Sequence, residues 1–316
     1  MHFNRKSRYA VVIGGANIDI TGASSAALVA GDSNPGIVRF SAGGVARNVA
    51  ENLARLDVPV YFLTVFGGDM YAEHMKQECM QTGIDISAAQ TLPERTSSVY
   101  LCINDAAGEM QLAVSDMNLY DSLTPEYIAV NMPLINGAAV CITDTNIPKA
   151  SLEFLARHCT VPLFIDPVST AKAEKIRDIL PFIHTIKPNK MEMQCLTGIR
   201  LTDDRSLRNA AAVLLQAGVK RLIVSLGKDG LFCSDAGQCL LLPAMEVSPV
   251  STTGAGDSLF AGIAWAFIHG FDLETSARVG QAAASICIES PHTVSRSVTK
   301  ELLCKRAGIR GEEYGI

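Results

Sequence analysis

Short runs of β-branched residues alternate with longer helical patterns along this chain, and this order constrains the fold more than any other feature. It is the order required by a mostly parallel sheet covered by helices, since each parallel strand needs a long crossover to the next. The expected core strands are residues 9–13, 60–65, 138–143, 163–166, 184–187 and 222–225. The expected helices are residues 45–56, 70–82, 203–217, 255–269 and 273–288, with a strand-like segment at 245–250.

Two stretches interrupt this rhythm. Residues 37–41 follow a turn at Asn34-Pro35-Gly36, and residues 97–115 have the pattern of a hairpin around Asn104 to Gly108. Together they predict a small accessory sheet. Because neither a Ser/Gly linker nor an internal repeat divides the chain, we expect one domain over residues 1–316, with a discontinuous lid from about 18–41 and 96–116.

Composition and charge narrow the partners. The 316 residues are 48% hydrophobic and carry a net charge of −5, so the chain has no basic stripe for nucleic-acid phosphates. No run of eighteen apolar residues occurs, and residues 1–8 lack a signal-peptide pattern. The nine cysteines form no C-x-x-C motif and are expected to be reduced, buried thiols; the six histidines show no metal-ligand spacing. We expect a cytoplasmic protein with a small-molecule partner and no membrane contact.

The strongest chemical signal is STTGAGD at residues 251–257, at the start of an amphipathic helix. Glycines allow a tight turn that converges backbone N–H groups on one point, which suits a phosphoryl group. Asp257 falls in the first helical turn, where it could accept a proton from an attacking hydroxyl. The alternative is a plain connector followed by an acid that stabilises a helix terminus.

TGAGD before a small-residue helix resembles the signature of the ribokinase-like (PfkB) carbohydrate kinases, and the likeness spans nearly the whole chain. The resemblance implies a three-layer α/β/α sandwich with a mostly parallel central sheet and a small β-sheet lid. It also implies ATP and Mg²⁺ as cofactors. In this family the turn and the following aspartate are catalytic, which here are Gly254, Ala255, Gly256 and Asp257.

Two further motifs resemble the family's sugar-binding elements: GGANID at residues 14–19 and SAGGVARN at 41–48. The implied sugar ligands are Asn17, Asp19, Gly43, Gly44 and Asn48. A carboxylate can accept hydrogen bonds from two vicinal hydroxyls, and a glycine pair lets a flat ring approach the backbone. Either motif is also typical of an ordinary turn at a strand end or a helix entry. A dinucleotide site is disfavoured because G-x-G-x-x-G is absent.

The nucleotide side of the family has its own likenesses: KPNKME at residues 187–192, SLGKDG at 225–230 and GQAAAS at 280–285. The resemblance implies that Asn189 and Glu192 organise Mg²⁺ through water, since a hydrated cation prefers oxygen ligands. Their alternative reading is a helix N-terminus. The implied nucleotide-binding residues are Lys187, Asn189, Ser225, Gly227, Gly230, Thr253 and Gln281.

A finer likeness, in DSNPG at residues 32–36, GGVARN at 43–48 and DMN at 116–118, resembles the bacterial pseudouridine kinases within this family. It implies phosphorylation of a ribose 5′-hydroxyl. Asn146 stands where ribokinases carry a glutamate, and Ser115, Asn118 and Tyr100 are candidates for reading the base, although Tyr100 also suits strand packing.

Several alternatives stay open. The chain could act on ribose, adenosine, inosine or a keto-deoxy sugar acid, or be a non-catalytic sugar-binding regulator. Ser251 replaces an aspartate that often helps hold K⁺ in this family, so activation by K⁺ is in doubt. Because exposed lid edges favour pairing, a homodimer through the lid is expected.

Overall fold

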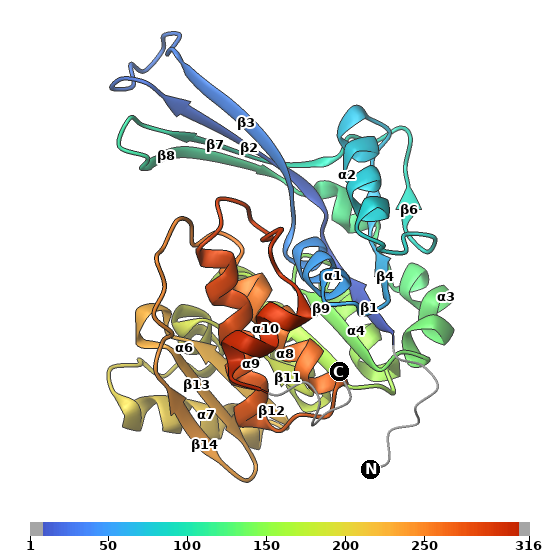
Figure 1. The fold of residues 1–316 in the computed structure, drawn as a ribbon. Coiled ribbons are helices and arrows are strands. Elements are labelled where there is room, and N and C mark those ends of the chain that lie inside the picture. The colour runs from blue at the N-terminus through green and yellow to red at the C-terminus, as the bar shows by residue number, and fades with distance from the viewer. Residues whose placement is uncertain (1–8, 310–316) are drawn as a thin grey trace.

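The centre of the molecule is an eight-stranded sheet, seen in a computed structural model that describes residues 9–309 (Figure 1). The strand order is β14-β13-β12-β11-β10-β9-β1-β4; the six strands from β12 to β4 are parallel, and β13 and β14 are antiparallel additions at one edge. The strands are β1 (Ala10–Ile13), β4 (Val60–Leu63), β9 (Val140–Asp144), β10 (Leu163–Asp166), β11 (Thr185–Ile186), β12 (Arg221–Ser225), β13 (Leu231–Asp235) and β14 (Cys239–Leu242).

Helices cover both faces of this sheet and form two separate hydrophobic cores. One core joins the sheet to α1 (Val45–Arg55), α2 (Met70–Gln81), α8 (Ala255–Ile268), α9 (Leu273–Ile288) and α10 (Lys300–Ala307). The other joins it to α3 (Pro125–Asn136), α4 (Lys149–His158), η2 (Glu174–Phe182), α6 (Lys190–Thr197) and α7 (Asp204–Gln216). Along β1, Ala10 and Val12 enter the first core whereas Val11 and Ile13 enter the second, as the alternation of a strand requires. The predicted three-layer α/β/α sandwich is confirmed.

A small four-stranded sheet projects from this body (Figure 1). Its order is β3-β2-β7-β8, formed by β2 (Asn17–Ser24), β3 (Gly36–Gly43), β7 (Ser98–Asn104) and β8 (Met110–Asp116). The two stretches that interrupt the sequence pattern are therefore strands of a second sheet. The remaining elements are β5 (Val65–Phe66), β6 (Gln90–Thr91), η1 (Asn118–Ser122), α5 (Thr170–Ala173) and η3 (Gly227–Asp229).

The strand register gives the small sheet two unlike faces. Asp19 lies opposite Ser41 and Tyr100, and Tyr100 lies opposite Ser115, so these four side chains share the face that carries Asp19. The other face is apolar. It consists of Val38, Phe40, Leu101, Leu112 and Val114, whose side chains are all exposed.

The six predicted core strands and five predicted helices all form, with ends within two residues of the prediction. The strand-like reading of residues 245–250 was wrong, because this segment has no regular structure. Pro243 precedes it and Pro249 lies within it, and neither offers an N–H to a neighbouring strand; the Val250 N–H donates to the Ile288 carbonyl at the end of α9 (2.8 Å). No helix within residues 9–309 is long and apolar enough to cross a membrane.

Candidate active site

Asp257 lies in the first turn of α8, next to a sharp backbone turn. Gly254 caps this helix with a φ of 79°, and a Cβ atom there would lie 1.9 Å from the Thr293 carbonyl oxygen, so only glycine fits. The Ala255 N–H donates to the Thr252 carbonyl (3.3 Å). Within residues 9–309, the N–H groups of Gly256 and Asp257 have no hydrogen-bond partner, as is usual at a helix start. They form an electropositive end that suits a phosphoryl group.

The Asp257 carboxyl is half-buried and receives a hydrogen bond from α1, because Asn48 Nδ2 donates to its Oδ2 (2.8 Å). Burial raises the pKa of Asp257 to about 7, and the nearby carboxylates of Asp166 and Asp144 add to the rise. The Asn48 hydrogen bond and the Lys187 ammonium act in the opposite direction. An acid with a pKa near neutrality is suited to take up a proton at physiological pH.

A buried ion pair stands beside the start of α8. Lys187 Nζ lies 3.1 Å from Asp166 Oδ2, and both residues are buried. A Cβ atom on Gly256 would lie 3.5 Å from Lys187 Nζ, which places the ammonium against the helix terminus. The Val168 N–H donates to the other Asp166 oxygen (2.9 Å), and Val168 has a φ of 63°, which is rare for a β-branched residue. Strain of this kind clusters at functional sites.

Asn17 and Asp19 form a polar group at the start of β2, where the chain passes from β1 of the central sheet into the small sheet. Asn17 Nδ2 donates to Asp19 Oδ1 (2.6 Å), and the Tyr120 hydroxyl donates to Asn17 Oδ1 (3.4 Å). A Cβ atom on Gly43 would lie 2.2 Å from Asp19 Oδ2, so a side chain at that position would displace the carboxylate. Burial raises the pKa of Asp19, against the opposing effects of Asn17 and Arg47.

Asp144 ties this region together from the end of β9. Its carboxylate accepts hydrogen bonds from the N–H groups of Gly15 (3.3 Å), Ala46 (3.0 Å) and Asn146 (2.9 Å). It therefore joins the turn after β1, the start of α1 and the loop after β9. Next to it, Lys172 Nζ donates to the Asn146 side-chain oxygen (2.5 Å). The Asn146 NH₂ group also interacts with the Asp144 carboxylate, which opposes the rise that burial causes in the pKa of Asp144, and its second hydrogen remains for a ligand.

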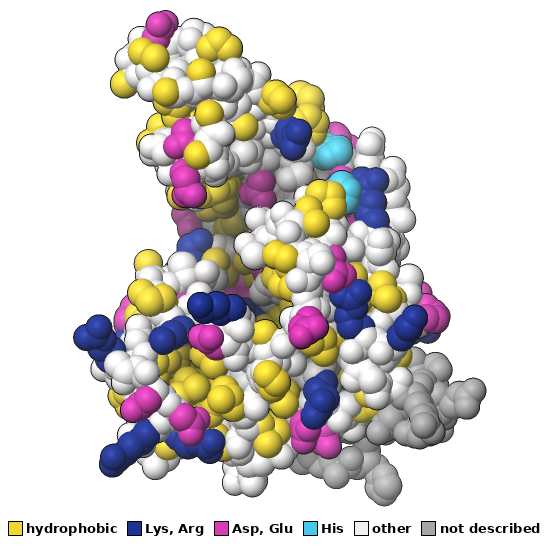
Figure 2. All heavy atoms as spheres, turned by 60° about the vertical axis from the view of Figure 1, so that its left-hand side comes forward, with side chains coloured by type: hydrophobic (Ala, Val, Ile, Leu, Met, Phe, Trp, Pro, Cys, Tyr) yellow, Lys and Arg dark blue, Asp and Glu magenta, His cyan; other side chains and the backbone are white. Residues whose placement is uncertain are grey.

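The molecule is hollowed between the small sheet, which carries Asp19, and the body, which carries Asp257. Figure 2 shows this cleft, with acidic and basic side chains inside it. The site residues follow the carboxyl ends of β1, β9, β10 and β11, which is the edge where open parallel sheets bind ligands.

Comparisons with known proteins assign the chain to a family. A family model described as pfkB family carbohydrate kinase matches residues 7–300. The chain belongs to the pfkB family of carbohydrate kinases. It is 37% identical over 291 residues to the pseudouridine kinase of Escherichia coli K12, a match that covers 92% of this chain and 93% of that enzyme.

Solved structures of kinases share this fold. A carbohydrate kinase from Agrobacterium tumefaciens is 28% identical, with a TM-score of 0.84 and coverage of 96% of this chain and 97% of that one. The Arabidopsis thaliana ribokinase complexed with ribose and ATP has a TM-score of 0.85 over 96% of this chain and all (100%) of that one; at 22% identity it shows the shared fold. This pfkB protein is therefore an ATP-dependent sugar or nucleoside kinase, a phosphotransferase with an alcohol acceptor.

The predicted nucleotide-side residues of this pfkB kinase lie at the ends of β11 and β12. Asn189 and Glu192 form a capping box at the start of α6: the Asn189 N–H and Nδ2 donate to the two Glu192 oxygens (both 2.8 Å), and Asn189 Oδ1 accepts from the Glu192 N–H (2.9 Å). The helix-terminus reading of this motif is therefore present. The backbones of Ser225 and Asn189 form an isolated parallel β-bridge.

The other predicted binding residues make no hydrogen bond with Asp257 or with the Lys187–Asp166 pair among the described residues. Gly227 and Gly230 form the turn after β12, and Thr253 is exposed. Gln281 Nε2 donates to the Pro243 carbonyl (2.8 Å). Asn118 lies in η1 beyond the small sheet and donates through Nδ2 to Asp116 (3.2 Å).

Sequence reasoning missed three residues of the site: Asp144, Asp166 and Lys172. A signal for the two aspartates exists, because each ends a buried parallel strand and such ends meet at one edge of the sheet. Lys172 lies in α5, a single short turn, and carries no comparable signal.

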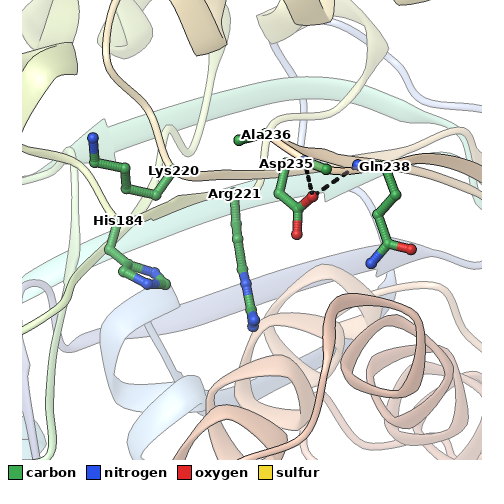
Figure 3. A pocket seen from close by; sticks show the side chains of 7 residues that line it. His184, Lys220, Arg221, Asp235, Ala236 and Gln238 are labelled. Carbon is green, nitrogen blue, oxygen red and sulfur yellow. Dashed lines mark hydrogen bonds between the residues drawn. The ribbon is translucent and has the colours of Figure 1, made fainter. Parts of the chain in front are cut away.

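A cavity of about 500 Å³ opens at the opposite edge of the sheet, where β11 and β12 begin (Figure 3). His184, Lys220, Arg221 and Asp235 are among the residues that line it, and none of the predicted site residues does. Burial, together with Arg221 and Lys220, lowers the pKa of His184 to about 4. The Asp235 Oδ1 is occupied by the N–H groups of Gly237 and Gln238. This cavity is separate from the candidate active site.

Proposed function

We propose that this kinase transfers the γ-phosphoryl group of ATP to the ribose 5′-hydroxyl of pseudouridine, giving pseudouridine 5′-phosphate and ADP. The observation that carries the proposal is the Asp257 carboxyl beside the unpaired amides of α8. The substrate is supported by the 37% identity to a pseudouridine kinase over 92% of the chain.

The ribose would be held between the two sheets. Asp19 can accept hydrogen bonds from two vicinal hydroxyls, since Asn17 orients its carboxylate and Gly43 leaves room for its Oδ2. Gly43 and Gly44 let the backbone approach this site closely, because a Cβ atom on Gly43 would lie 2.2 Å from Asp19 Oδ2 and one on Gly44 would lie 2.4 Å from the Gly15 carbonyl oxygen. Asn48, next to Asp257, would orient the sugar so that its 5′-hydroxyl faces the Asp257 carboxyl.

The chemical step then needs one base and several positive groups. Asp257 accepts the hydroxyl proton as the 5′-oxygen attacks the γ-phosphorus, and the bond to the β-phosphate oxygen breaks with release of ADP. The Gly256 and Asp257 N–H groups, with Lys187, face the charge that spreads over the transferring oxygens.

A magnesium ion is general for ATP-dependent kinases, and the donor chemistry here fits it. Asn189 and Glu192 present amide and carboxylate oxygens beside the buried Lys187–Asp166 pair. Each carboxylate oxygen of Glu192 keeps lone pairs beyond those used by Asn189, which suits a contact through water. When bound, the ion would neutralise phosphate charge.

The base of the nucleoside would be read near Asn146. Its side-chain oxygen is occupied by Lys172, so the NH₂ group and the ammonium both offer donors to carbonyl oxygens of a uracil ring. Ser115 shares the Asp19 face of the small sheet and is a further candidate.

The second candidate function is phosphorylation of another nucleoside or sugar, as the ribokinases among its relatives suggest.

The small sheet would act as a lid over the sugar, excluding water from the phosphoryl group. The other face of the small sheet exposes Val38, Phe40, Leu112 and Val114. An exposed apolar face of this kind marks an interaction surface. We propose that a second copy of the chain covers this face in a homodimer.

An ADP-release assay with pseudouridine, uridine, ribose and adenosine tests the function, each with and without potassium. The expected result is a preference for pseudouridine and little response to potassium, because Ser251 brings no carboxylate to a cation. ADP release with ribose or adenosine alone would favour the second candidate. No release with any acceptor would overturn the kinase proposal for this panel.

A further inference from the structure

Arg47 is a buried cation in the first turn of α1, beside the residue that contacts the catalytic carboxyl. Its side chain is 6% exposed, and its Nη2 forms ion pairs with Glu51 (2.6 Å) and Glu78 (2.8 Å). Its Nη1 donates to the Ala42 carbonyl of β3 (3.3 Å) and to Asn48 Oδ1 (3.2 Å). The guanidinium is therefore held by two carboxylates on one side and directed at the Asn48 amide on the other.

The Asn48 amide has two ends of similar shape but opposite hydrogen-bonding character. A guanidinium only donates, so it must face the amide oxygen and cannot face the NH₂ group. With Oδ1 turned to Arg47, Nδ2 is turned to Asp257 Oδ2, where it donates over 2.8 Å. Asn52 Nδ2 donates to the main-chain carbonyl of Asn48 (2.9 Å), so it does not compete with Arg47 for the side-chain amide oxygen.

We propose that Arg47 is a positioning residue for catalysis: it fixes the orientation of the Asn48 amide so that Asp257 is offered a donor and never an acceptor. A donor stabilises the ionised carboxylate, whereas a protonated carboxyl would need an acceptor at the same place. Without the guanidinium, the amide can turn over and accept a hydrogen bond from neutral Asp257. Arg47 thus favours the form of Asp257 that can take up a proton.

The other charges near Asp257 come from different elements and do not depend on Arg47. Asp166 and Asp144, at the ends of β10 and β9, raise the pKa of Asp257, and Lys187 after β11 lowers it. Cys287 on α9 also faces Asp257, which raises the pKa of that thiol together with burial as the larger cause. From α1, Glu51 and Arg47 neutralise one another as an ion pair. A substitution that keeps the charge at position 47 therefore isolates the effect of the amide orientation.

The test is an Arg47→Lys protein, which keeps the positive charge but loses the fork that reaches both Glu51 and Asn48. The Asp257 carboxyl is titrated by ¹³C NMR in the full chain without substrates. The expected result is a rise of about one pH unit in the Asp257 pKa, which at pH 7 lowers the ionised fraction roughly fivefold. An unchanged Asp257 pKa in a folded Arg47→Lys protein would overturn the proposal.

Two controls separate positioning from general damage. Arg55→Lys alters the other α1 arginine that pairs with Glu51 (2.7 Å) and does not contact Asn48, so the Asp257 pKa should stay at its wild-type value. In an Asn48→Ala background, Arg47→Lys should cause no further rise, because its effect passes through the amide. A rise of equal size in that background would show that Arg47 acts by another route and would count against the proposal.

If Arg47→Lys does not fold, Arg47→Met combined with Glu51→Gln removes the guanidinium together with one of its two carboxylate partners, so the net charge is kept, and the same rise is expected. Turnover is a second readout that rests on the proposed function: kcat at pH 7 should fall roughly fivefold and recover at higher pH, with KM nearly unchanged. A wild-type protein that never consumes ATP would defeat the proposed function, whereas the NMR titration would still decide the role of Arg47.

Discussion

Lys187 and Asp166 form an ion pair of 3.1 Å in which both residues are buried, at the point where α8 presents its free amides. Burial alone lowers the pKa of the Lys187 ammonium, but the carboxylates of Asp166, Glu192 and Asp257 outweigh it and raise the pKa. The lysine therefore stays charged at the place where a phosphoryl group would arrive. It neutralises the buried Asp166 carboxylate and faces the site at the same time.

Replacing Lys187 by Met separates these two roles. The single substitution leaves the Asp166 carboxylate buried without a partner, which costs about 3–5 kcal/mol of unfolding free energy. Adding Asp166→Asn removes that charge and should restore most of the stability, whereas kcat should stay at least about a hundredfold low because the cation is still missing. Urea unfolding and ADP release measure the two effects. Wild-type turnover in the double variant would show that the pair is structural only.

Asp257→Asn tests the proton acceptor itself. The amide keeps the size of the carboxyl and its contact with Asn48, so ATP and the acceptor should bind with nearly unchanged affinity in calorimetry. Turnover should fall at least about a hundredfold, the usual scale for loss of a general base. Near-normal turnover would remove Asp257 from this role and would point to a base elsewhere in the cleft.

Local features of this site could be predicted from the sequence, whereas its long-range contacts could not. The start of α8 was predictable because the glycines at 254 and 256 are followed closely by apolar residues at helical spacing, so the whole signal is local in the sequence. The hydrogen bond from Asn48 to Asp257 joins residues 209 positions apart and exists only because α1 and α8 lie side by side in one core. The family resemblance supplied both residues, but not their contact.

The errors have equally particular causes. The segment at 245–250 has apolar residues typical of a strand, but Pro243 just before it and Pro249 within it cannot donate the hydrogen bonds of a sheet. β13 and β14 were not predicted. They are short and follow the SLGKDG motif after β12 directly, so no α-helix separates them from β12 as it separates the parallel strands. Lys172 could not be found because its partner Asn146 lies on another loop, 26 positions away.

The raised pKa of Asp257 also makes a prediction about stability. An acid whose pKa rises from 3.8 to about 7 on folding binds more protons in the folded state, so its ionisation destabilises the fold progressively between those pH values. Asp257→Asn removes this cost. Its melting temperature should exceed that of the wild type by several degrees at pH 8 and by much less at pH 4.5, as measured by circular dichroism. An equal difference at both pH values would contradict the raised pKa.

The apolar face of the small sheet predicts the oligomeric state. Val38→Asp and Val114→Asp each place a charge on the face that a second copy would cover, so the protein should elute as a monomer in light-scattering chromatography, whereas the wild type elutes as a dimer. Ala113→Asp is the matched control, because Ala113 is exposed on the opposite face of the same strand and should leave the dimer intact. A monomeric wild type would defeat the prediction at once.

Lys172 should govern which acceptor is chosen. Its ammonium donates to Asn146 Oδ1, so the Asn146 NH₂ group can donate one hydrogen to Asp144 and the other to a ligand carbonyl, which a uracil ring offers and a free sugar does not. Lys172→Ala should therefore raise KM for pseudouridine at least about tenfold while changing KM for ribose less than about twofold, since a lost hydrogen bond to a charged group is worth about 1.5–3 kcal/mol. Lys149→Ala, an exposed lysine paired with Asp178, is the control and should change neither value. If Lys172→Ala weakened both acceptors equally, Lys172 would hold the loop and take no part in reading the base.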